Sequence, residues 1–108
     1  SLYKQLIYGK DWFVGMDNIQ IIHLPDLQFV RYCEKKYKVN RGIYNTIDSW
    51  LYGKGLYNIE VRRKVIIQFL EYVSYAYKNS KVKFGAGGLS SCLSQFWTMH
   101  MRQMKAIP

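Results

Sequence analysis

Apolar residues recur at helical spacing in two short stretches that lie close together in the chain. In the first stretch, residues 27–38, an apolar residue returns every three or four positions, as Leu27, Val30, Cys33 and Tyr37. This spacing places the apolar side chains on one face of a helix. Pro25 and Asp26 come directly before it, and both residue types are typical of a first helical turn. The pattern therefore predicts a helix over residues 27–38.

The second stretch follows almost at once and predicts a partner helix. Asn40 is a suitable N-cap, because its side chain can accept a hydrogen bond from a free backbone amide. Gly53 and Gly55 are expected to end the helix. The predicted buried stripe comprises Ile43, Ile47, Trp50 and Leu51.

Two longer periodic segments occupy the second half of the chain. One runs from Asn58, as a cap, to about Lys78, and we expect it to form the backbone of the core. Its apolar stripe consists of Val61, Val65, Ile66, Phe69, Leu70, Val73 and Tyr77. The other is a last helix capped by Ser90 or Ser91. Its apolar face consists of Leu93, Trp97, Met101 and Met104.

Short β-rich runs interrupt this helical pattern. Residues 12–16 and 19–24 flank Asp17 and Asn18, which predicts a β-hairpin near residues 12–24. Residues 81–84 alternate like a short strand, and residues 85–88 form a flexible glycine-rich link. The predicted fold class is mainly α (α+β), with four or five helices and a small hairpin in a single domain, residues 1–108. This domain is compatible with being part of a longer protein.

Charge changes this picture more than any other feature of the composition. Sixteen Lys and Arg residues against seven Asp and Glu give a formal net charge of +9 and a sequence pI of about 9.6. An excess of this size attracts polyanions such as nucleic acid, acidic proteins or anionic lipid. The alternative is a basic protein with no special partner.

The residues that could support metal or catalytic chemistry are scattered. Cys33 and Cys92 form no CxxC or Cys/His spacing, and His23 and His100 are isolated, which argues against a structural zinc site or another cofactor. We expect two free buried thiols, with a single bridge as the alternative. The acids form no close pair for general acid–base work. The prediction is therefore binding and no enzymatic activity.

Targeting and membrane signals are absent from the sequence. No apolar run approaches the ~18 residues of a membrane span, and no signal peptide opens the chain. This pattern predicts an intracellular protein, cytoplasmic or nuclear.

The helix pair over residues 27–52 has the order of a helix-turn-helix, whose second helix enters the DNA major groove. The face of the second helix opposite its apolar stripe carries Arg41, Asn45, Ser49 and Tyr52, residue types that contact base edges and phosphates. The first helix adds Arg31, Lys35, Lys36 and Lys38 as phosphate contacts. Asp48 would also point near the phosphates. The alternative is an ordinary αα-hairpin with a solvated basic face.

Two further basic clusters are candidates for nucleic-acid contact. Arg62, Arg63 and Lys64 are expected at the solvent face near the start of the long helix. A third cluster, in which lysines alternate with aromatic rings, suits single-stranded nucleic acid because bases stack on rings while phosphates find charge. It consists of Tyr75, Tyr77, Lys78, Lys81, Lys83 and Phe84.

The segment from Tyr8 to Asp17, which reads YGKDWFVGMD, resembles the opening of Bro-type N-terminal domains in viral and phage DNA-binding proteins. The resemblance covers about ten residues, and the sequence after Asn18 departs from the pattern. It implies DNA binding in a viral or phage context.

These observations favour a nucleic-acid-binding domain, with DNA preferred over RNA as the partner. The alternative is a protein–protein assembly module that uses the aromatic-rich surface and the last helix. A homodimer is predicted because the apolar stripe of the last helix is too wide to leave in water. That stripe is Leu93, Trp97, Met101 and Met104, and its docking on the chain's own core is the alternative.

Overall fold

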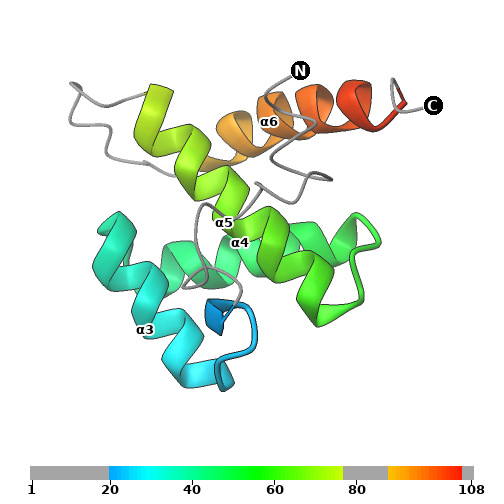
Figure 1. The fold of residues 1–108 in the computed structure, drawn as a ribbon. Coiled ribbons are helices and arrows are strands. Elements are labelled where there is room, and N and C mark those ends of the chain that lie inside the picture. The colour runs from blue at the N-terminus through cyan, green and yellow to red at the C-terminus, as the bar shows by residue number, and fades with distance from the viewer. Residues whose placement is uncertain (1–19, 77–87, 106–108) are drawn as a thin grey trace.

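The computed structural model describes residues 20–76 and 88–105 and is helical throughout this part (Figure 1). The mainly α class is therefore confirmed, and the described residues include no strand. The helices are α3 (Asp26–Tyr37), α4 (Arg41–Gly53), α5 (Ile59–Ala76) and α6 (Gly88–Lys105).

Asparagine side chains fix two of the helix starts. The Asn40 Oδ1 accepts a hydrogen bond from the Ile43 amide at 2.8 Å, and the Asn58 Oδ1 accepts one from the Val61 amide at 3.1 Å. Each cap satisfies an amide that has no partner inside its helix. Both predicted caps are confirmed. The predicted serine caps of the last helix are wrong, because α6 begins at Gly88 and includes both serines within its first turns.

The connections around α4 place two residues in the left-handed backbone region. Gly55, with φ of 100°, follows the end of α4, as expected for a glycine at a helix C-terminus. Lys38, with φ of 58°, caps the end of α3, although a residue with a Cβ is disfavoured there. The tight corner between α3 and α4 is therefore made without glycine.

The predicted hairpin is not found where the structure describes it. Gln20 and Ile21 are helical, and the amides of His23 and Leu24 donate to the carbonyls of Gln20 and Ile21 at 3.1 Å each. These bonds form turns, so residues 20–24 are not a strand. Residues 12–19 of the hairpin, the strand at 81–84 and link residues 85–87 lie outside the described residues.

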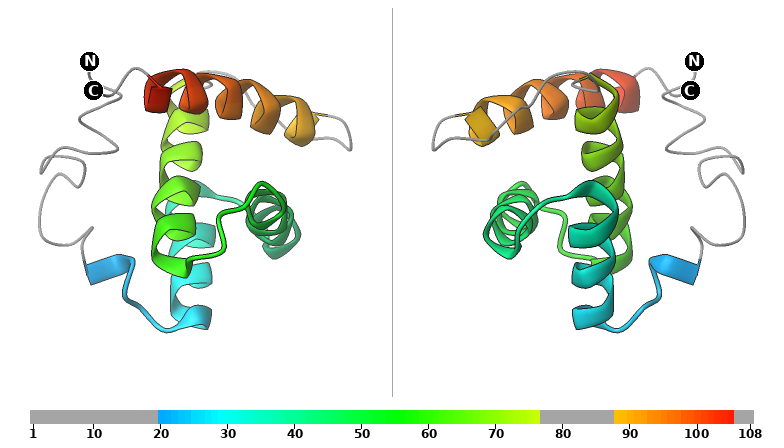
Figure 2. Two further views of the ribbon diagram at one scale, coloured as in Figure 1. Left: turned by 90° about the vertical axis from the view of Figure 1, so that its right-hand side faces the viewer. Right: turned by 90° about the vertical axis from the view of Figure 1, so that its left-hand side faces the viewer.

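Helix α5 is the centre of the fold. Residues 65–70 are all buried, although a run of six residues covers every side of a helix. Helices α3, α4 and α6 all contact α5. In Figure 2, α4 is viewed almost along its axis while α3 and α5 are seen from the side, so α4 crosses both at a steep angle. The expectation that this segment forms the backbone of the core is confirmed.

The hydrophobic core contains side chains from α3, α4, α5 and α6, and some of the buried residues differ from those of the predicted apolar stripes. Phe29 is fully buried, whereas Leu27 is exposed, and Val61 at the start of α5 is also exposed. Tyr44 adds a ring to the core, edge-on to Phe29 at 6.1 Å between centroids. The largest fully buried side chains are Phe29, Cys33, Ile47, Leu51, Ile66, Phe69, Leu70, Leu93 and Phe96.

Helix α6 packs on the chain's own core through most of its apolar face. Leu93 is fully buried, and the Trp97 ring lies edge-on to Trp50 of α4 with centroids 5.9 Å apart. The stripe proposed for dimerisation is therefore largely covered, and the reason for predicting a dimer does not apply to these residues. Met101 is exposed, and the Met104 side chain lies outside the described residues.

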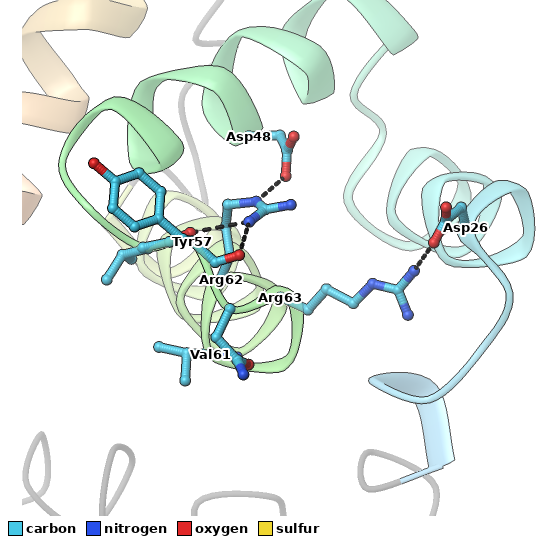
Figure 3. A network of polar contacts seen from close by, with 8 residues as sticks. Asp26, Asp48, Tyr57, Val61, Arg62 and Arg63 are labelled. Atoms are coloured by element: carbon cyan, nitrogen blue, oxygen red, sulfur yellow. Dashed lines mark hydrogen bonds and ion pairs between the residues drawn. The ribbon is translucent and has the colours of Figure 1, made fainter.

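Arg63 is buried and ties the segment before α3 to α5. Its Nη1 donates to the carbonyls of Ile22 at 3.0 Å and Leu24 at 2.6 Å. Its Nη2 contacts the Asp26 carboxylate at 2.6 Å (Figure 3). Its guanidinium carbon also lies 4.6 Å from the centroid of the Phe29 ring. A planar guanidinium with several donors can satisfy all these partners at once.

Both cysteines are free and buried, as predicted. Burial raises the pKa of the Cys33 thiol to about 12. A thiol in this state is a packing residue, because only the thiolate is strongly nucleophilic.

None of the described helices is long and apolar enough to span a membrane.

The Arg63 contacts lead to a stability prediction. Arg63→Met should lower the free energy of unfolding by about 3 kcal/mol, because the buried carbonyl of Ile22 and the partly buried carbonyl of Leu24 lose a charged donor. Asp26→Asn should cost less, since 88% of the Asp26 side chain is exposed. Urea unfolding of both variants measures the difference. Equal decreases would mean that the carbonyl contacts add nothing to the ion pair.

The burial of His100 leads to a pH prediction. Burial lowers the pKa of His100 below its ordinary value of 6.5, so the folded chain holds the neutral imidazole. Below pH 6.5 the unfolded chain takes up a proton that the folded chain does not, and stability falls as the pH is lowered. His100→Phe should remove this part of the decrease, whereas His23→Gln should retain it. Urea unfolding between pH 7 and 5 tests this expectation, and an unchanged pH dependence in His100→Phe would contradict it.

Candidate nucleic-acid interface

Every acid in the part of the chain that the structure describes lies near a basic side chain from another segment. Four acids face Lys or Arg, and Glu60 faces His23, which carries charge only when it is protonated. The closest nitrogen–oxygen distances range from 2.6 to 3.7 Å. Most of these pairs join two helices, and the acids are thereby committed to internal contacts. The five pairs are Asp26–Arg63, Glu34–Arg41, Asp48–Arg62, Glu60–His23 and Glu71–Lys36.

Arg62 stabilises the turn between α4 and α5 through hydrogen bonds. Its Nε donates to the Asp48 Oδ1 at 2.7 Å, and its Nη1 donates to the carbonyls of Leu56 at 2.9 Å and Tyr57 at 3.2 Å (Figure 3). Asp48 therefore binds Arg62, which corrects the expectation that its carboxylate points toward phosphates.

The second predicted basic cluster is not a solvent face. Arg62 is only 12% exposed at its side chain and Arg63 only 7%, and both use their donors on the protein itself. Lys64 is half-buried. The periodicity missed this arrangement because it assumes that a charged side chain marks an exposed position. These three residues are not part of the candidate interface.

Lys36 also makes its contacts within the protein. Its Nζ lies 3.6 Å from the Glu71 carboxylate and 5.5 Å from the centroids of the Tyr32 and Tyr37 rings. A hydrogen bond with Tyr32 raises the pKa of Lys36 most. The Tyr37 hydroxyl donates to Glu71 at 2.6 Å, and burial followed by this bond raises the pKa of Tyr37. This cluster joins α3 to α5.

The remaining three predicted cations of the first helix form one exposed ridge, which we name the α3 ridge. Arg31 and Lys35 lie four residues apart on one face of α3, and Lys38, the left-handed residue directly after the helix, is exposed at its C-terminal end. That face is opposite the buried Phe29 and Cys33. In the part of the chain that the structure describes, none of the three has an acid partner. Their charge therefore faces solvent.

The predicted outer face of α4 is exposed as expected. Arg41, Asn45, Ser49 and Tyr52 all lie on it. Arg41 donates to the Glu34 carboxylate from Nε at 3.2 Å and from Nη2 at 3.0 Å, so its charge is already neutralised within the protein. The exposed face of α4 is therefore polar and nearly uncharged.

The turn after α4 contains exposed residues that the sequence prediction missed. Tyr57 is among the most exposed large side chains described, and its ring lies 4.9 Å from that of Tyr52. Lys54 is exposed beside them, with its Nζ 4.9 Å from the centroid of the Trp50 ring. In the sequence, Tyr52 is a predicted contact and Gly53 and Gly55 indicate the helix end, whereas Lys54 and Tyr57 carry no prediction.

The third predicted cluster cannot be placed. Residues 77–84 lie outside the described residues, as does the side chain of Tyr75. Among the residues that are described, no three His, Cys, Asp or Glu side chains come together in a group that could hold a metal ion.

One curated protein is similar to this chain over most of the length of this chain. It is the RNA-binding riboflavin kinase RibR of Bacillus subtilis (strain 168), which is 36% identical over 87 residues. The match covers 78% of this chain but only 38% of that protein. No protein-family profile matches the chain. No solved structure matches it.

Proposed function

We propose that this chain binds nucleic acid, with RNA preferred, through the α3 ridge and the adjoining outer face of α4. The observation that carries the proposal is the exposure of Arg31 and Lys35 on α3 and of Lys38 at its C-terminal end, without acid partners among the described residues. Binding of phosphates to such a ridge releases counterions and needs no rearrangement of internal ion pairs.

Lys38 supports this function of the α3 ridge. Its backbone has a φ of 58°, where glycine is favoured and a residue with a Cβ costs roughly 1–2 kcal/mol. A lysine at this corner weakens the fold locally but places a cation at the end of the ridge. Disfavoured backbone of this kind is commonest at functional sites.

The preference for RNA rests on two observations. The similar protein from Bacillus subtilis is named as RNA-binding, although the chain matches only 38% of its length. In addition, the one cation on the outer face of α4 is paired with Glu34, which leaves few groups for the phosphates that flank a major groove. Duplex DNA bound by a helix-turn-helix is the second candidate, because Asn45 and Ser49 are exposed on the second helix of the pair.

The proposal assigns binding and no catalytic step to this chain. The kinase activity in the name of the similar protein is not carried over, since most of that protein lies outside the match. A kinase assay with riboflavin and ATP tests this part directly.

The first binding prediction concerns salt. Arg31→Gln/Lys35→Gln should weaken binding of a labelled RNA oligonucleotide and make log Kd less dependent on log salt. The slope should fall by about 0.7 for each phosphate that the variant no longer neutralises on a single strand, or about 1.4 in all. Fluorescence anisotropy across a range of salt concentrations measures it, with DNA of the same sequence in parallel.

The chain offers a matched control for this variant. Arg102 and Lys105 are one arginine and one lysine, exposed on α6 away from the α3 ridge. Arg102→Gln/Lys105→Gln makes the same charge change and should leave the slope near that of the parent. Equal shifts in the two double variants would assign binding to net charge and not to the ridge. A parent chain that binds no nucleic acid at low salt would overturn the proposed function.

Lys38→Gly separates binding from stability. The change removes one ridge cation and also relieves the disfavoured backbone, so affinity should fall while stability rises by up to about 1 kcal/mol. Urea unfolding and anisotropy on the same protein samples measure both. A fall in stability would show that the Lys38 side chain is needed by the fold.

The Glu34–Arg41 pair gives a prediction of the opposite sign. Glu34→Gln should strengthen RNA binding, because it removes a carboxylate beside the interface and frees the Arg41 guanidinium. Arg41→Gln alone should cost less than Lys35→Gln, since the charge of Arg41 is already neutralised. Anisotropy at one fixed salt concentration compares the three variants. If Glu34→Gln binds more weakly than the parent, the outer face of α4 does not approach phosphates.

A further inference from the structure

Two exposed tyrosines stand together on the turn that joins α4 to α5. The Tyr52 side chain is 53% exposed and that of Tyr57 is 67% exposed. Their ring centroids are 4.9 Å apart, and the ring planes are tilted by 69°. Large aromatic surface is costly to leave in water, and neither ring is buried in the core.

The turn beneath the rings is held firmly by backbone and side-chain bonds. The Gly55 amide donates to the Tyr52 carbonyl at 3.0 Å, and the Tyr57 amide donates to the Gly55 carbonyl at 2.9 Å. Arg62 then donates to the Tyr57 carbonyl, and its guanidinium carbon lies 5.4 Å from the Tyr52 ring centroid. Figure 3 shows the Tyr57 ring extending away from the guanidinium that its carbonyl contacts. The backbone positions from which the two rings project are therefore held by hydrogen bonds, and the rings contact each other.

We propose that Tyr52 and Tyr57 form a stacking platform for unpaired bases of a single-stranded nucleic acid, with Lys54 providing charge for its backbone. This inference rests on the proposed function and specifies the form of nucleic acid that is bound. Base stacking on aromatic side chains tolerates any sequence and is the usual means of holding single strands.

The tilt of the rings selects single strands over duplexes. Bases inside a duplex lie parallel to one another, so they cannot stack on two rings whose planes differ by 69°. Bases splayed out of a strand can adopt different orientations and meet each ring separately. The charge of the turn agrees with this partner, because Lys54 is exposed and the nearby Asp48 is neutralised by Arg62.

A second copy of this chain is the competing occupant. Ile59 and Val61, which follow the turn, are also exposed, and apolar surface of this kind can serve a protein contact. The net charge of +9 favours a polyanion over a second copy, since two such chains repel each other.

The experiment compares Tyr57→Ala with Tyr57→Phe, and Tyr52→Ala with Tyr52→Phe, on a single-stranded RNA and on an RNA duplex of the same length. Each alanine variant should weaken single-strand binding about 5- to 150-fold, the equivalent of removing one stacked base. The phenylalanine variants should bind like the parent, because they keep the ring. Duplex binding should change little in all four. Thermal unfolding checks that each variant is folded.

The results separate this inference from the proposed function. If the parent binds no nucleic acid, both are overturned. If the parent binds with the predicted salt dependence but the alanine variants bind single strands as tightly as the parent does, only the platform is overturned. The same conclusion follows if the alanine variants lose affinity for single strands and duplexes equally. Light scattering on the same proteins gives the remaining outcome. Self-association that Tyr57→Ala abolishes, without any effect on RNA binding, would assign the rings to a second copy and overturn the platform.

Discussion

The complete burial of the middle of α5 is the constraint on which the rest of the structure depends. A helix buried on every side needs neighbours on every side, and α3, α4 and α6 supply them. This arrangement also buries Arg63 within the same helix. Because an unpaired buried charge is very costly, its guanidinium must bind the carbonyls of Ile22 and Leu24 and the Asp26 carboxylate. The position of the segment before α3 thus follows from the need to satisfy one arginine.

The same packing determines where charge remains on the surface. Four of the acids in the described residues pair with Lys or Arg across helix boundaries, and Glu60 faces His23, which is charged only when it is protonated. A basic chain that uses its few acids internally is left with cations on its outer faces. On α3 these cations are aligned by the helical repeat and form a ridge, whereas on α4 the lone cation is neutralised by Glu34. The asymmetry between the two helices is a consequence of how the fold is held together.

Local sequence signals predicted the positions of the helices well. They predicted poorly which charged side chains are buried and which groups they bind. Asn40 and Asn58 mark helix starts because a cap depends only on residues three positions away. The burial of Arg63 depends on partners that lie 37 to 41 residues away in the sequence. The spacing of apolar residues within one helix carries no information about such partners. Leu27 and Phe29 illustrate a smaller error, since either could begin an apolar stripe and only tertiary packing decides between them. For the candidate interface, the outer face of α4 and all three cations of the α3 ridge were predictable, whereas the internal pairing of Lys36 with Glu71 was not. The platform on the following turn was not, because glycines there were interpreted only as a helix end.

The candidate interface divides its work between two kinds of contact. In the proposed function, cations on α3 would attract phosphates of any sequence, while polar and aromatic groups on α4 and its turn would distinguish the form of the nucleic acid. Arg62 joins α4 to the turn that follows it. It binds Asp48 of α4 and the carbonyl of Tyr57 with one guanidinium, so the backbone at Tyr57 is positioned by an arginine whose side chain is only 12% exposed. An arginine predicted to contact the nucleic acid directly would then act on it indirectly, by keeping the stacking rings in place.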